Sequence, residues 1–135
     1  MKKVFTLLLL TLTVLLLSGC SIFENDNNYM RPEDFARQLT KDGIHVDSIK
    51  PLMPQPLSAS AAVELKIGPS SIGVYKYDTA IKVQRARLER IKKNKRVYLN
   101  GIPYPVYEVS GSFIIVGLDK HKDKKRILES FRNFK

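Results

Sequence analysis

A predominantly apolar run from Val4 to Leu17 is the feature that most constrains this chain. It follows the charged start Met1-Lys2-Lys3 and leads through Ser18 and Gly19 to Cys20, the single cysteine of the 135 residues. So long an apolar segment is not expected to lie exposed on the surface of a small domain in water. The fold must therefore be built by the residues that follow, and it cannot contain an internal disulfide.

This order of features resembles the signal peptide of bacterial lipoproteins, with Leu17-Ser18-Gly19-Cys20 as the lipobox. The resemblance implies cleavage before Cys20, a thioether link from its sulfur to diacylglycerol, and acylation of the new amine by a fatty acid such as palmitate. A transmembrane anchor and an ordinary secretory signal are the alternatives. The run of about fourteen residues is short for the roughly twenty of a spanning helix. An ordinary signal would leave a free thiol near the new N-terminus.

Three segments are expected: a signal peptide over 1–19, a flexible tether over 20–31, and a single α+β domain over 32–135. Nothing in the polar tether is expected to pack. The resemblance implies attachment to the cell membrane through the lipid on Cys20, which two or three acyl chains make stable. In a Gram-negative cell, Ser21 in place of Asp after the cysteine resembles lipoproteins of the outer membrane that face the periplasm.

The chain is strongly basic, with 23 Lys+Arg against 13 Asp+Glu and a formal net charge of +10. Such a balance indicates nucleic acid, anionic lipid head groups, another acidic partner, or a role in solubility alone. Outside the cytoplasm we expect no nucleic acid as a partner. Anionic lipid head groups or an acidic envelope partner are the better candidates.

The first half of the domain is expected to form a helix, a short strand and a hairpin. Pro32 suits the first position of a helix, and Gly43 suits its end. Alternating residues over 44–49 predict a short strand, and residues 62–77 predict a hairpin. Between them, the prolines of 51–57 predict an extended loop whose apolar side chains either cover the core, which we favour, or offer a docking surface.

The second half is expected to form a helix, two strands and a last helix. A helix is predicted over about 78–93, with a polar cap at its start. Asn100-Gly101 predicts a turn, and strands are predicted near 104–109 and 112–118. The last helix is predicted over about 122–133.

This order predicts an α+β fold, with an antiparallel sheet of four to five strands and about three helices packed mainly on one face. Five residues are expected to be buried together in its core: Leu65, Val74, Leu88, Ile115 and Phe131.

The domain also resembles a family of small secreted or lipid-anchored bacterial proteins of unassigned function. The resemblance is carried by Phe35, Leu39 and Gly43, by the strand 72–77, and by Gly111 before an apolar strand. It implies no catalytic residues.

No pattern of residues indicates catalysis, a metal or a cofactor. His45 and His121 have no partner at metal-ligand spacing, and both are expected at the surface. Ser110-Gly111-Ser112 suits a turn and lacks the Gly-x-Ser-x-Gly pattern of a nucleophile elbow. The carboxylates are scattered along the chain, and their spacing does not predict a catalytic pair.

The unusual feature is the clustering of basic residues in two places. One cluster occupies the helix 78–93, and Lys95 and Arg96 follow it. The other surrounds the start of the last helix, where positive charge opposes the helix dipole. The candidate anion-binding residues are Lys82, Arg85, Arg87, Arg90, Lys92, Lys93, Lys120, Lys122, Lys124, Lys125 and Arg126.

We therefore expect a membrane-anchored envelope lipoprotein with a non-enzymatic binding or structural accessory role, acting through a basic surface. If the clusters act together, Arg85, Arg87 and Arg90 should lie near the start of the last helix. The alternative is a cell-surface hydrolase or an enzyme accessory whose site assembles only in three dimensions. A pocket with close, buried carboxylates or a Ser–His pair would favour the alternative.

Overall fold

The computed structural model describes residues 27–135, which form one α+β domain. Its helices are α2 (Pro32–Lys41), α3 (Lys82–Asn94) and α4 (Lys124–Arg132), with a 3-10 turn η2 (Gln55–Leu57). Its strands are β1 (Ser48–Pro51), β2 (Ala61–Ile67), β3 (Ser70–Lys76), β4 (Arg96–Leu99), β5 (Ile102–Pro105), β6 (Val109–Ser110) and β7 (Phe113–Val116).

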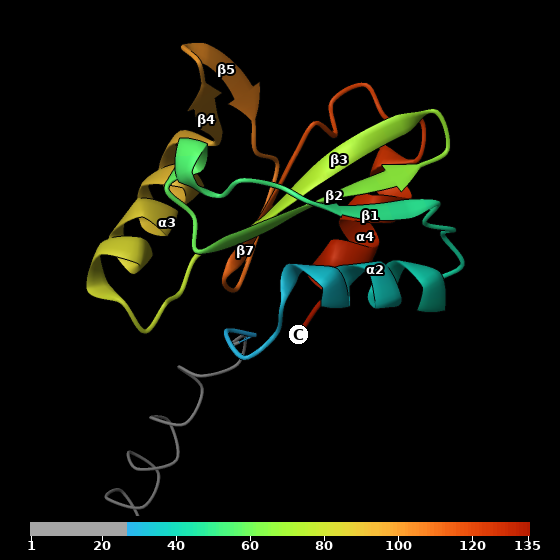
Figure 1. Ribbon diagram of the computed structural model, residues 1–135, viewed down its shortest axis with the longest axis horizontal. Coiled ribbons are helices and arrows are strands. Elements are labelled where there is room, and N and C mark those ends of the chain that lie inside the picture. The colour runs from blue at the N-terminus through green and yellow to red at the C-terminus, as the bar shows by residue number, and fades with distance from the viewer. Residues whose placement is uncertain (1–26) are drawn as a thin grey trace, which may run out of the picture.

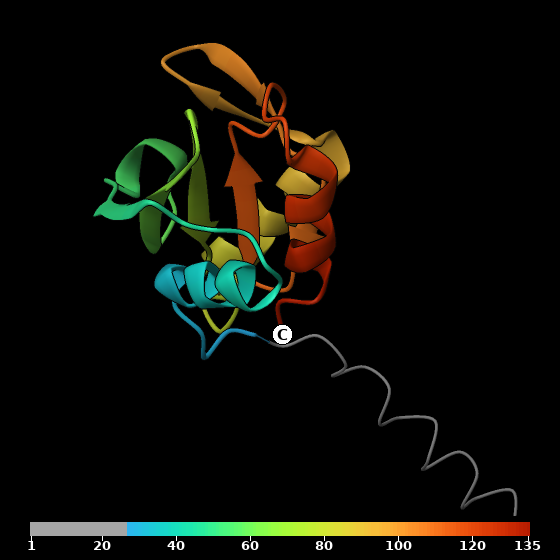
Figure 2. The same cartoon turned by 90° about the vertical axis from the view of Figure 1, so that its right-hand side faces the viewer.

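Five strands form one antiparallel sheet in the order β1-β2-β3-β7-β6, and β4 pairs with β5 in a separate two-stranded sheet. Helices α2 and α4 pack on one face of the large sheet, while α3 and the β4–β5 hairpin lie on the other (Figures 1 and 2). The predicted α+β fold, with an antiparallel sheet and most helices on one face, is confirmed.

The larger core lies between the sheet and the pair α2 and α4. Alternate residues of β2 and β3 point into it, as the period of two requires for a sheet with a buried face. Phe35 of α2 anchors the helix pair, because its ring centroid lies 5.4 Å from that of Phe131 and 5.3 Å from that of Phe134. Pro32 occupies the first turn of α2, and Gly43 follows its end with φ +83°, both as predicted.

The smaller core lies on the other face, under α3 and the β4–β5 hairpin. Tyr75 and Tyr77 enter it from β3 and the residue after β3, and Leu88 is the buried residue of α3. The five predicted core residues are all buried, but they do not form one group: Leu88 belongs to this smaller core and the other four to the larger. The sheet separates them because both of its faces are covered.

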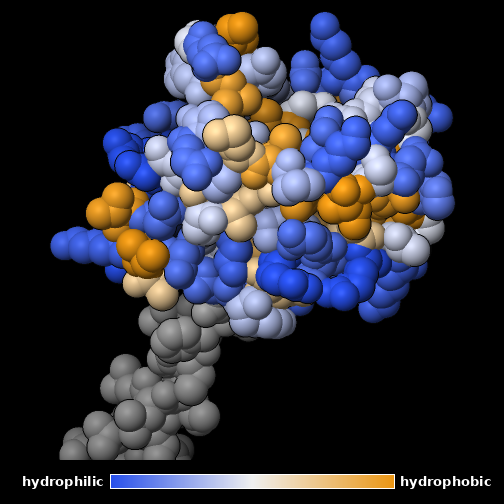
Figure 3. All heavy atoms as spheres, viewed as in Figure 1, coloured by the Kyte–Doolittle hydropathy of each residue, from blue (hydrophilic) through white to orange (hydrophobic). Residues whose placement is uncertain are grey.

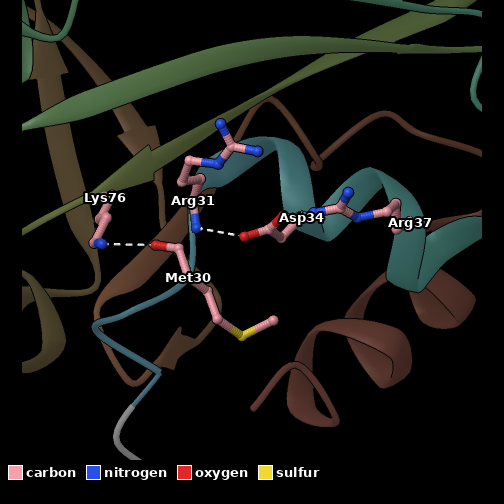
Figure 4. Close-up of polar contacts among 5 residues, drawn as sticks. All are labelled: Met30, Arg31, Asp34, Arg37 and Lys76. Carbon is pink, nitrogen blue, oxygen red and sulfur yellow. Dashed lines mark hydrogen bonds and ion pairs between the residues drawn. The ribbon is translucent and has the colours of Figure 1, made fainter.

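Residues 27–31, the described part of the predicted flexible tether, pack against the domain. Asn27 is 1% exposed, and its side-chain amide donates hydrogen bonds to the carbonyls of Phe134 (2.8 Å) and Ser110 (3.1 Å). Lys76 Nζ donates to the carbonyl of Met30 at 2.6 Å (Figure 4). The prediction that this stretch cannot pack is wrong from residue 27 onward, because its polar groups bind backbone carbonyls rather than apolar surface. Residues 20–26 lie outside the described residues.

Several local predictions also need correction. Strand β1 covers 48–51 instead of 44–49, and α3 begins at Lys82 instead of 78 or 79. The strand predicted near 104–109 is divided between β5, which ends at Pro105, and β6, which begins at Val109. The hairpin β4–β5 around Asn100-Gly101 was not predicted, although the turn was. The proline-rich loop does cover the smaller core through Leu57, while Met53 is exposed.

Within residues 27–135, no helix is long and apolar enough to cross a membrane.

Candidate functional site

Helix α3 divides its basic side chains between two flanks. Leu88 is buried against the sheet. Because of the helical period, the residue one position before Leu88 and the residue two positions after it lie on the same flank of α3. Arg87 and Arg90 lie on that side and line one hollow, whereas Lys92 lines a different hollow on the other side. The α3 cluster is therefore not one continuous patch.

The first hollow is strongly positively charged. It has a volume of about 290 Å³ and gathers three arginines: Arg87 and Arg90 of α3, and Arg96 at the start of β4. We call it the arginine hollow. No carboxylate is among its lining residues. The full lining is Pro56, Leu57, Ser58, Tyr77, Arg87, Arg90, Ile91, Asn94, Arg96, Val97 and Tyr98.

Backbone carbonyls hold one side of the arginine hollow. Ser58, which ends η2 in a left-handed conformation at φ +53°, presents its carbonyl to α3. Arg87 Nη1 donates to this carbonyl at 3.3 Å, and Gln84 Nε2 donates to it at 3.0 Å. Arg87 is half-buried by this contact and is the most fixed of the three arginines. Its remaining guanidinium donors can serve a ligand.

Tyr77 forms part of the floor and stays uncharged. Its hydroxyl donates to the carbonyl of Leu57 at 2.8 Å. Burial raises the pKa of Tyr77 to about 12, and the nearby Tyr75 adds to this effect while the positive charge of Arg87 opposes it. At neutral pH the phenol therefore adds no negative charge, and the hollow keeps the full charge of its three arginines.

None of these arginines is in an ion pair among residues 27–135. The ion pairs of this part of the chain join Arg37 to Asp34, His45 to Asp47 and Arg132 to Glu108. Three unneutralised guanidinium groups on a concave surface raise the local positive potential and attract anions.

The basic residues around α4 lie on the opposite face of the sheet. Arg126 Nη2 donates to the carbonyl of Gly43 at 3.3 Å, and Lys124 Nζ lies 3.6 Å from the centroid of the Tyr107 ring. Lys120, Lys122 and Lys125 are exposed.

The two basic clusters approach each other at Tyr107. This residue lies against Lys124, and together with Lys92 and Lys95 it lines the second hollow. Joint action of the two clusters would require Arg87 and Arg90 to lie near the start of α4. The structure does not place them there, because α3 and α4 cover opposite faces of the sheet: Leu88 of α3 belongs to the smaller core and Ile127 of α4 to the larger.

Lys82, Arg85 and Lys93 are exposed on α3 outside both hollows. Arg85 Nη1 donates to the carbonyl of Thr79 at 3.0 Å.

The histidines do not form a reactive pair with a serine in the described part of the chain. His45 is exposed, with Nε2 3.4 Å from Asp47 Oδ1. His121 is buried, which contradicts the prediction that it lies at the surface. Its Nδ1 accepts from the N–H of Asp123 at 3.1 Å and its Nε2 lies 3.1 Å from the carbonyl of Ile67, so it links the turn before α4 to the end of β2.

Among residues 27–135, no group of three or more His, Cys, Asp or Glu side chains is placed to hold a metal.

Two parts of the arginine hollow were not predicted from the sequence. Arg96 was noted only as a residue after the helix, and Tyr98 was not assigned to a strand. The alternation of Val97 and Leu99 with these two residues, directly before Asn100-Gly101, is a hairpin signal that would have placed both on one face.

No family model, curated protein or solved structure matches the chain. The resemblance of the domain to small lipid-anchored proteins therefore stays a prediction. The lipobox residues lie outside the described residues.

Proposed function

We propose that this protein is a membrane-anchored envelope lipoprotein with a non-enzymatic binding role, and that the arginine hollow holds an acidic group of its partner. The observation that carries the proposal is the convergence of Arg87, Arg90 and Arg96 on one hollow whose lining contains no carboxylate. The anchor part of the proposal rests on the Leu17-Ser18-Gly19-Cys20 sequence.

The hollow suits a phosphate or carboxylate carried on a partly apolar body. Arginine presents a planar fork of donors that matches both groups, and its hydrogen bonds to them are charge-assisted. Apolar side chains also line the hollow, with Leu57, Ile91 and Val97 among them. An acidic envelope partner offers such a group.

The anchor is tested by the Cys20→Ala variant. The wild type should incorporate labelled fatty acid and sediment with membranes. The variant should lose the label, and should either leave the membrane or remain as an uncleaved precursor. Normal maturation and firm membrane binding of Cys20→Ala would refute the lipid anchor.

The hollow is tested by titrating inorganic pyrophosphate and polyphosphate into the mature chain held in neutral detergent. The triple variant Arg87→Gln, Arg90→Gln, Arg96→Gln should bind at least tenfold more weakly, since each charge-assisted hydrogen bond contributes about 1.5–3 kcal/mol. Binding should also weaken as salt shortens the Debye length below about 8 Å.

The matched control carries three changes on the other cluster: Lys122→Gln, Lys124→Gln and Lys125→Gln. It loses the same formal charge but leaves the hollow intact. Equal losses in the two triple variants would mean that net charge alone attracts the anion. A wild type that binds neither probe would refute the hollow as an anion site.

A further inference from the structure

The packed segment 27–30 defines where the anchored end of the domain lies. Asn27 is fixed to the carbonyls of Ser110 and Phe134, so the domain cannot swing freely about this point. If Cys20 carries the lipid, as the proposed function holds, seven residue steps separate it from Asn27. A chain of that length spans at most about 25 Å. The surface around Asn27 is therefore within close reach of the bilayer.

Exposed apolar side chains gather at this end. Tyr29 is 78% exposed, Ile81 51% and Val83 59%. They are close because Asn28, next to Tyr29, accepts the N–H of Thr79 through Oδ1 at 3.0 Å. Figure 3 shows apolar surface over the start of α3, beside the place where the described chain begins. Ile81 and Val83 belong to neither core, so packing within the domain does not explain their positions.

Positive charge surrounds these apolar side chains. Lys82 and Arg85 are exposed within the first turns of α3. No side chain caps this helix start, and its first turn contains no acidic residue, so the positive end of the helix dipole is not compensated there. Asp78 is the nearby carboxylate, and its Oδ1 accepts from Asn28 Nδ2 and from the N–H of Ala80, each at 3.0 Å. Apolar side chains within a basic surround suit an interface between water and anionic lipid.

We propose that this anchor end, defined by Tyr29, Ile81, Lys82, Val83 and Arg85, lies against the anionic lipid surface that holds the acyl chains of Cys20. The apolar side chains enter the head-group boundary, and the basic ones face lipid phosphates. The β4–β5 hairpin lies at the opposite end of the domain from the anchor end (Figures 1 and 2). Tyr98 of that hairpin, which also lines the arginine hollow, is therefore held away from the membrane.

The chain contains no tryptophan, so a single introduced tryptophan reports its own surroundings. The full lipidated protein is placed in liposomes of phosphatidylglycerol and phosphatidylcholine with brominated acyl chains, which quench nearby indole emission. Val83→Trp is the reporter, and Ile81→Trp is a second one in case the first disturbs α3. Tyr98→Trp, also at an exposed position, is the matched control.

An interfacial apolar side chain lies about 5–10 Å into the head-group boundary. The Val83→Trp or Ile81→Trp emission should therefore shift to shorter wavelength and lose most of its intensity, while that of Tyr98→Trp stays unchanged. Flotation of the protein with the liposomes reports the lipid anchor separately. Failure to float refutes the anchor. Flotation with no quenching at either reporter, or with equal quenching at Tyr98→Trp, overturns the docking of this end.

Discussion

The side-chain oxygen of Asn27 accepts a hydrogen bond from the backbone N–H of Ser112 at 2.8 Å, across 85 positions of the chain. The amide nitrogen of the same side chain binds the carbonyls of Phe134 and Ser110. One buried amide thus ties the start of the described chain to the turn before β7 and to the residues after α4.

Replacing Asn27 by Ala should destabilise the domain by about 1–3 kcal/mol, because the buried N–H of Ser112 loses its partner and the carbonyl of Phe134 is left with the Ser110 hydroxyl at 3.3 Å. Urea unfolding measures this loss. Asn27→Asp keeps the acceptor but sets a carboxylate against two carbonyls, so the loss of stability at neutral pH should be at least as large as that of Asn27→Ala. Stability should recover as acid protonates the carboxylate. Tyr29→Ala, at an exposed neighbour, is the control. Equal stability of Asn27→Ala and the control would show that the segment contributes nothing.

Leu65→Ala and Phe131→Ala should each cost about 2–5 kcal/mol, because both side chains are fully buried in the larger core. Leu88→Ala should fall at the low end of this range, since it removes the one buried side chain of α3 from the smaller core. Shifts of the urea midpoint at constant slope measure all three. No shift for two of the three would contradict the placement of the cores.

The fold could be predicted because its signals are local. Alternation in β2 and β3, proline at the start of α2 and glycine after its end each act over a few residues. The burial of Asn27 and His121 could not be predicted, because it depends on carbonyls that distant segments leave free. We assigned these polar residues to the surface. A buried backbone carbonyl that has no backbone partner, however, needs a polar side chain as its hydrogen-bond donor.

Gly73→Ala should be destabilising although the backbone there is ordinary strand. A Cβ at this position would lie 2.8 Å from Cε2 of Tyr75, a ring that is itself buried. Overpacking of this kind costs about 1–3 kcal/mol. The double variant Gly73→Ala, Tyr75→Val should cost less than the sum of its single changes, because the smaller side chain removes the clash. Additive losses in this cycle would place the cause elsewhere.

Tyr77 makes the stability of the domain sensitive to alkaline pH. Burial raises the pKa of Tyr77 from 10.0 to about 12 in the folded state. Below pH 10 the phenol is neutral in both the folded and the unfolded state, so Tyr77 makes its full contribution to the free energy of unfolding. Between these two values the unfolded phenol has lost its proton and the folded one has not, so the free energy of unfolding falls as pH rises.

Urea unfolding at a series of alkaline pH values should show this fall, and phenolate absorbance should show a late-titrating tyrosine. Tyr77→Phe should remove the late phase and flatten the pH dependence. Tyr98→Phe, at an exposed ring, should leave both unchanged. A late phase that survives in Tyr77→Phe would assign it to another tyrosine.

The arginine hollow was less accessible to prediction than the fold. Its residues come from η2, the end of β3, α3 and β4, and no local pattern joins these elements. The charges of α3 were identified from composition, but their division between two flanks depends on Leu88 pointing to the sheet and on the hairpin that places Arg96.

The bond between Asn27 and the carbonyl of Phe134 spans 107 positions and has a consequence for the order of folding. A chain that is made or exported from its N-terminus presents Asn27 first and Phe134 last. The sheet can pair before this contact exists, whereas the contact itself must await the end of the chain. Any step that acts near Asn27 while the chain is incomplete therefore meets this segment free of the domain, and any later step meets it bound.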